Sequence, residues 1–112
     1  MLLTTSGLAR SGGRQDGESV FALDRATGRV LWSTLLGGPC YDRAYAVEVD
    51  ASGVYVAGRA GEGFPTTSGA HQVRFAGDGR RQGAYGDQDG FVAKLSLDGA
   101  RLVWSTYFGE DQ

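Results

Sequence analysis

Cysteine and histidine, two residue types on which many catalytic and metal sites depend, are nearly missing from this sequence of 112 residues. It contains one cysteine, Cys40, and one histidine, His71. A single cysteine can form neither a disulfide within the chain nor a cysteine-based zinc cluster. The histidine stands in the stretch GAHQ with no cysteine or second histidine nearby, so we interpret it as an ordinary loop residue.

The chain also lacks a charge excess and long apolar runs. Eleven lysines and arginines stand against 13 aspartates and glutamates, a formal net charge of -2. This balance provides no broad attraction to nucleic acid or anionic lipid, and we expect neither as a partner. No run approaches the roughly 18 apolar residues that a membrane-spanning helix needs. The opening stretch MLLTTSGLAR has neither the charged start nor the sustained apolar segment of an export signal, so none is visible.

Motifs for nucleophilic catalysis and phosphate binding are missing as well. No serine lies in a Gly-x-Ser-x-Gly elbow, and the sequence offers the serines and threonines no histidine partner. The glycine-rich stretch AGRAGEG follows an expected strand but opens no helix, which argues against a phosphate-binding loop. The sequence therefore predicts a protein that is not an enzyme.

What the sequence does contain is glycine and short apolar segments. It has 19 glycines, and its apolar residues fall into runs of strand length that are bounded by glycine or aspartate. This pattern is typical of an all-β protein with tight turns. We predict no helix and six strands: SVFALD, VLWSTLL, AYAVEVD, VYVAG, GFVAKLSL and LVWSTYF.

Alternation and turn residues support these strands. Two of them show the period-2 pattern of a half-buried strand, and the residues expected on the buried side are Phe91, Ala93, Leu95 and Leu97 in one and Tyr45, Val47 and Val49 in the other. Aspartate and glycine, which tolerate the backbone angles of tight turns, mark three hairpin connections at residues 24–28, 50–53 and 97–100.

The chain repeats itself. Trp104-Ser105-Thr106 follows Trp32-Ser33-Thr34 at an offset of 72 positions, and the stretch at Thr66–Gly69 echoes Thr4–Gly7 at an offset of 62. The difference of ten positions predicts an insertion in the later copy, in the glycine-rich segment 74–89. We expect this segment to be an exposed, mobile excursion that can be shortened with little effect on folding. Repeats of this length built from strands are typical of propellers and related arrays.

The stretch YAVEVDASGVYVAGRAGEGFPTTSGAHQ, followed by DGFVAKLSLDGARLVWSTYFGE, resembles the bacterial seven-bladed β-propeller repeat, called the SBBP repeat. Units of that family have a VYVTG-like strand, an FPTT-GA loop, a DAFVAKL-like strand and a VYSTYLGG-like strand. The resemblance covers nearly all of residues 44–110. It implies a propeller fold and a bacterial protein that is secreted or lies at the cell surface.

A second resemblance lies in ALDRATGRVLW. This stretch is similar to the tryptophan-docking motif of quinoprotein-type propellers, whose matching positions here are Ala22, Asp24, Thr27, Gly28 and Trp32. The later copy departs from the motif, because Ser96, Gly99 and Ala100 replace the expected aspartate, threonine and glycine. Both resemblances imply the same fold.

The resemblance also implies a division of the chain into about one and a half blades. Residues 1–18 would be a loop remnant of a preceding blade, 19–36 the outer hairpin of a partial blade, and 44–108 a complete four-stranded blade with its strands in chain order. A propeller needs about four to eight blades to close. We therefore expect a fragment of a larger propeller, a truncated reading frame, or a protomer that completes its sheets with other copies.

Four apolar residues are our candidates for packing between blades: Trp32, Trp104, Leu23 and Leu95. Stacking of the tryptophans on a ligand is the alternative, but we favour packing, because a tryptophan on an outer strand ordinarily docks against the neighbouring unit. Asp78, Asp87 and Asp89 are weak candidates for a calcium site. They lack the aspartate ladder and the bidentate glutamate of such sites, so we favour plain turns and expect no metal.

Two functions remain open at this stage. The first is a non-catalytic repeat module with a structural or interaction role, binding other blades, further copies of itself, or an unknown protein, glycan or surface. The second is a fragment of a dehydrogenase propeller that uses pyrroloquinoline quinone and calcium. We favour the first, with no cofactor, because the chain shows one complete docking motif and no cofactor contacts that we can locate. Strand edges and apolar faces that lack partners within the chain also predict that the isolated chain forms a ring-like homo-oligomer or an aggregate.

Overall fold

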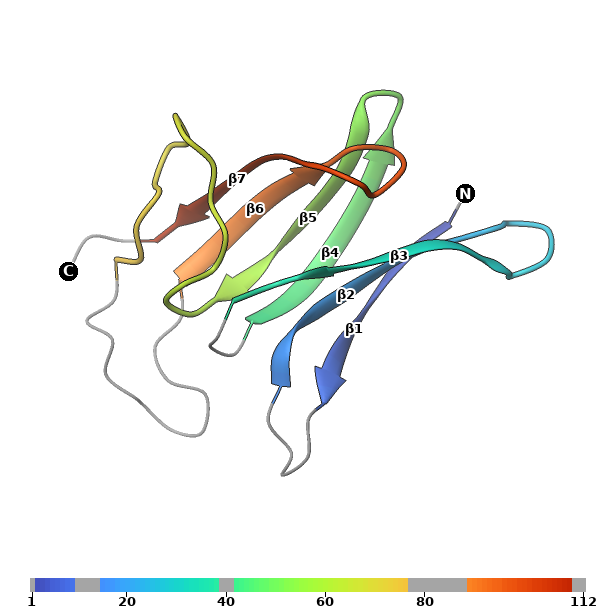
Figure 1. The fold of residues 1–112 in the computed structure, drawn as a ribbon, viewed down its shortest axis with the longest axis horizontal. Helices are drawn as coiled ribbons and strands as arrows, with labels where there is room; N and C mark the ends of the chain where they lie inside the picture. The colour runs from blue at the N-terminus through green and yellow to red at the C-terminus, as the bar shows by residue number, and fades with distance from the viewer. Residues whose placement is uncertain (1, 10–14, 39–41, 77–88, 110–112) are drawn as a thin grey trace.

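The computed structural model describes residues 2–9, 15–38, 42–76 and 89–109, and all regular secondary structure in them is β-strand. The strands form two antiparallel sheets (Figure 1). The first sheet has the order β1 (Leu2–Ala9), β2 (Gln15–Leu23), β3 (Val30–Leu36). The second has the order β4 (Asp42–Asp50), β5 (Gly53–Ala60), β6 (Asp89–Leu95), β7 (Leu102–Phe108). The all-β, antiparallel, helix-free prediction is therefore confirmed for the described residues.

The start of the chain differs from the prediction. The described residues contain seven strands rather than six, because β1 lies in the segment 1–18 that was expected to be a loop. The physical reason is a pairing partner distant in sequence: β1 runs antiparallel to β2, from Leu2 opposite Leu23 to Gly7 opposite Glu18. The echo at an offset of 62 is likewise not a shared structure, since its first copy lies in β1 and its second in a loop.

Three hairpin turns lie where aspartate and glycine predict them. In each turn an aspartate carboxylate accepts hydrogen bonds from backbone N–H groups ahead of it, as Asp24 does from Ala26 and Thr27, both at 2.9 Å. Asp50 and Asp98 do the same in their turns. Hydrogen bonding to the charged form lowers the pKa of all three carboxyls below the usual value.

Alternation along the strands decides which side chains reach the core. In β6, Phe91, Ala93 and Leu95 are buried as predicted, but Leu97 has left the strand and is exposed in the following turn. The prediction for β4 is wrong at Tyr45 and Val49, which are 66% and 40% exposed, while Val47 is partly buried and Ala44 is buried. A β-bulge between residues 44 and 46 shifts the alternation at this point, and sequence periodicity does not reveal it.

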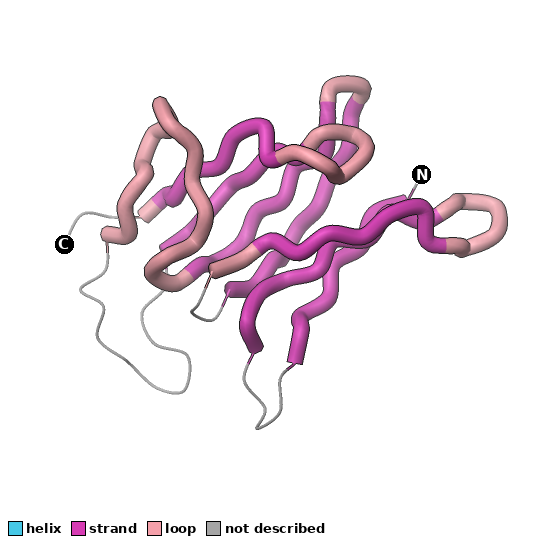
Figure 2. The backbone as a smooth tube through the Cα atoms, viewed as in Figure 1, coloured by secondary structure: helices cyan, strands magenta, loops and turns pink. Residues whose placement is uncertain are grey.

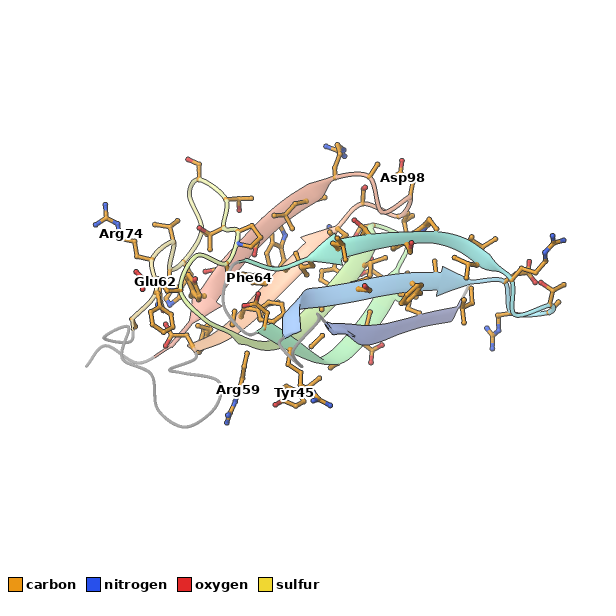
Figure 3. All side chains as sticks on the ribbon, turned by 60° about the horizontal axis from the view of Figure 1, so that its bottom comes forward. Tyr45, Arg59, Glu62, Phe64, Arg74 and Asp98 are labelled. Atoms are coloured by element: carbon orange, nitrogen blue, oxygen red, sulfur yellow. The ribbon has the colours of Figure 1, made fainter. Side chains whose placement is uncertain are left out.

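One hydrophobic cluster joins the two sheets. Strands β1 and β2 approach β4, so the first sheet lies against one face of the second. Phe64 lies inside the molecule, whereas Tyr45 and Arg59 project outward from the second sheet (Figure 3). The buried residues of the cluster are Val20, Leu36, Ala44, Val54, Val56, Ala60, Phe64, Phe91, Ala93, Leu95 and Tyr107.

The loop between β5 and β6 runs beside β7, the last strand of the second sheet (Figure 2). Its backbone bonds to the free side of that strand, because the Thr67 N–H donates to the Ser105 carbonyl at 3.1 Å and the Tyr107 N–H donates to the Gln72 carbonyl at 2.9 Å. The loop thus covers an edge that would otherwise be open to another chain. Most of the insertion predicted at 74–89 lies outside the described residues.

No helix in the described part of the chain has the length and apolar character needed to cross a membrane.

Candidate interaction surface

Trp32 lies at the junction of the two sheets. It projects from β3 onto the β6–β7 turn, where its indole Nε1 donates a hydrogen bond to the Leu97 carbonyl at 3.0 Å. Its ring covers Gly99, where a Cβ atom would come within 2.5 Å of the indole Cε3. Gly99 also has a φ of 71°, a conformation that favours glycine. A glycine at this turn position therefore both closes the hairpin and makes room for the tryptophan.

The other apolar candidates take different places. Leu95 is buried in the shared cluster. Leu23 is only partly buried. Val20 and Ala22 of the same strand face the second sheet, so Leu23, which follows Ala22, points to the other side. Of the two leucines, only Leu95 packs between the sheets.

Trp104 lies on the opposite, outward face of the second sheet. It is 37% exposed and contacts the Tyr55 ring in a tilted arrangement, with the ring centroids 6.3 Å apart. Lys94 passes over the same tyrosine ring, its Nζ 5.3 Å from the ring centroid and 3.1 Å from Ser52 Oγ. Phe108, on the same face, is stacked with His71 at 5.4 Å between centroids. No described sheet covers these side chains.

Of the three metal candidates, the structure describes only Asp89. Asp89 is buried, and its Oδ2 accepts hydrogen bonds from the Ala76 N–H at 2.6 Å and from Gln72 Nε2 at 3.3 Å. Its carboxylate therefore holds the β5–β6 loop. Asp78 and Asp87 lie outside the described residues. Within the described ranges, no three histidine, cysteine, aspartate or glutamate side chains are grouped to hold a metal ion.

Sequence reasoning missed Asp42, a buried carboxylate at the start of β4. It joins two segments by accepting hydrogen bonds from the Gly38 N–H at 2.8 Å and the Gly61 N–H at 3.1 Å. Burial raises its pKa to about 6, and these two hydrogen bonds oppose the rise. The sequence around Asp42 carries no local signal of burial, because its partners Gly38 and Gly61 meet it only in the folded chain.

Tyr107 extends this buried network. Its hydroxyl donates to the Gly61 carbonyl at 2.8 Å and accepts from the Phe64 N–H at 3.0 Å. Burial raises the pKa of Tyr107, so the phenol stays neutral and keeps both bonds. The described polar groups with perturbed pKa values thus anchor turns and loops, Asp24 in the first sheet and the others in the second.

Comparison with known protein families, curated proteins and solved structures finds no match to this chain.

Proposed function

We propose that this protein is a non-catalytic repeat module of the β-propeller type, with a structural or interaction role within a larger assembly. The observation that carries the proposal is the contrast between the two tryptophans. Trp32 is docked on a neighbouring sheet through a hydrogen bond and a glycine contact. Trp104, its repeat equivalent, is 37% exposed on a face that no described sheet covers, whereas Trp32 is partly buried.

The use of the polar side chains supports this role. The buried carboxylates of Asp42 and Asp89 accept hydrogen bonds from backbone N–H groups, and Asp24, Asp50 and Asp98 do so in hairpin turns. Ser105, which is fully buried, donates its hydroxyl to the Pro65 carbonyl. These groups serve to hold loops against sheets, which suits a scaffold that presents a surface.

Variants with a single tryptophan test the proposal at high dilution, where copies do not meet. With Trp104→Phe, the remaining Trp32 should be shielded from acrylamide quenching by its place between the sheets. With Trp32→Phe, the remaining Trp104 should be readily quenched, and the free energy of unfolding should fall more than in Trp104→Phe. Equal quenching and equal stability of the two variants would contradict the proposal.

The alternative is a fragment of a pyrroloquinoline-quinone-type dehydrogenase propeller. It is favoured by the docked geometry of Trp32, together with Asp24 bonding to Thr27 within the same docking-like motif. Titration with pyrroloquinoline quinone and calcium, followed by tryptophan fluorescence, distinguishes the two functions. The repeat module should show no saturable binding, whereas saturation that depends on calcium would favour the dehydrogenase fragment.

A further inference from the structure

The two tryptophan-bearing hairpins have the same register. In the first, Ala22 pairs with Trp32 and Val20 with Thr34. In the second, every partner lies 72 positions later, so Lys94 pairs with Trp104 and Val92 with Thr106. Both hairpins carry a β-bulge directly after the residue that faces the tryptophan. Corresponding residues therefore lie on corresponding faces of the two sheets.

That correspondence relates a covered face to an open one. In the first sheet, the face with Trp32, Val20 and Leu36 packs on the second sheet, and Leu36 is only 3% exposed. In the second sheet, the same face carries Trp104 and Phe108, and Phe108, the equivalent of Leu36, is 66% exposed. The second sheet thus repeats a docking face, and no described sheet is docked on it.

The reverse faces show the complementary pattern. Phe91, Leu95 and Tyr107 of the second sheet are buried on the face that receives the first sheet. In the first sheet, the position equivalent to Tyr107 is Leu35, which is 66% exposed. One molecule therefore has two different faces on which no described sheet lies: the Trp104 face, defined by Val92, Trp104 and Phe108, and the Leu35 face, defined by Phe21, Leu23 and Leu35.

We propose that a second copy of this chain docks head to tail, with the Trp104 face of one copy on the Leu35 face of the next. The contact would repeat the interface that already exists between the two sheets of each copy, with Trp104 over the β2–β3 turn of its neighbour. This inference rests on the proposed function and adds its partner and its register. Because the two faces differ, the contact is heterologous and continues into a ring or a filament.

One residue makes the β2–β3 turn a less favourable docking site for Trp104 than the β6–β7 turn is for Trp32. Trp32 lies over Gly99, but the equivalent residue in the β2–β3 turn is Thr27. In the proposed contact, the Thr27 side chain would occupy space that the indole of Trp104 needs. Lys94 also replaces Ala22 on the docking face, although its amine is turned aside toward Ser52. We therefore expect association at micromolar or higher concentration rather than a permanent complex.

Two matched variants test the contact. Leu35→Arg and Phe108→Arg place the same charge at positions of equal exposure, one on each open face. Sedimentation velocity of the wild-type chain should show oligomers that grow with concentration, and each variant alone should stay monomeric. Val73→Arg, an exposed loop position on neither sheet, is the control and should associate like the wild type. Circular dichroism establishes that all variants are folded.

Mixing the two variants provides the decisive result. Leu35→Arg keeps an intact Trp104 face and Phe108→Arg keeps an intact Leu35 face, so the mixture should form a heterodimer and nothing larger. Self-association of Leu35→Arg alone would indicate that two Trp104 faces pair with each other, and would overturn the head-to-tail contact. A wild-type chain that stays monomeric throughout, or a mixture without heterodimer, would also overturn it. The quenching of Trp32 does not depend on any of these results, so it tests the proposed function separately.

The register is tested by grafting one turn onto the other. The segments 24–28 and 96–100 have equal length, and each lies within a hairpin closed by the same pair of positions, Asp24 to Arg29 and Ser96 to Arg101. Replacing DRATG by SLDGA should tighten association about tenfold, the order expected for relief of an overpacked contact. Unchanged or weaker association would show that Trp104 does not meet this turn.

Discussion

Substitution of Gly99 by alanine should destabilise the protein far more than its turn conformation alone requires. The added methyl group would come within 2.7 Å of three indole carbons of Trp32, so the ring must move. Movement of the ring also weakens its hydrogen bond to the Leu97 carbonyl. The cost thus combines a backbone contribution and a packing contribution, and a second glycine separates the two.

That second glycine is Gly28, in the equivalent hairpin of the first sheet. Its φ of 74° is close to the 71° of Gly99, but a Cβ atom there would meet no atom within 4 Å. Gly28→Ala therefore measures the cost of a left-handed alanine, about 1–2 kcal/mol. Gly99→Ala adds the overpacking and the weakened hydrogen bond, about 2 kcal/mol more.

Urea unfolding followed by far-ultraviolet circular dichroism, at a dilution where copies do not meet, compares the two variants. A third measurement places both substitutions in a Trp32→Leu background, where the additional cost of Gly99→Ala should shrink toward that of Gly28→Ala. Equal destabilisation by the two alanines in the parent chain would refute the docking of Trp32 on this turn.

Three further predictions concern the second sheet. Tyr107→Phe should lower the free energy of unfolding by about 1–3 kcal/mol in urea melts, because the Phe64 N–H and the Gly61 carbonyl lose their shared partner. The pKa of Asp42 is raised from 3.8 to about 6, so its contribution to the free energy of unfolding is present below about pH 4 and is lost as the pH rises toward 6. This fall in the free energy of unfolding, followed by urea melts, should be absent in Asp42→Asn. Replacing residues 77–88 by two glycines should leave the melting temperature nearly unchanged, because the flanking Ala76 N–H and Asp89 Oδ2 are 2.6 Å apart; a large drop would contradict this.

Local chemistry made the hairpins of this protein predictable. The turns at Asp24, Asp50 and Asp98 follow from carboxylates and glycines a few residues apart, and the structure has all three. The alternation in β6 also identified Phe91 and Leu95 as buried, because successive side chains of a strand point to opposite faces. The repeat of 72 residues likewise indicated that one strand pattern occurs twice, and the structure pairs the strands of both copies in the same register.

Other features depend on segments that meet only in the folded chain. Strand β1 forms because β2 offers it a pairing edge, and Tyr45 turns outward because a bulge shifts β4. The β5–β6 loop lies along β7 through bonds between residues more than 30 positions apart, for which the sequence carries no period.

The two tryptophans show the division most clearly. Their Trp-Ser-Thr stretches are identical, and the sequence predicted each on the second strand of a hairpin, although it predicted neither β1 nor the register of the pairs. The difference between them comes from tertiary packing, since Trp32 is docked on the β6–β7 turn and Trp104 is 37% exposed. Burial is set by what packs on a face, and among the described residues a sheet packs on the face of Trp32, whereas none packs on the face of Trp104.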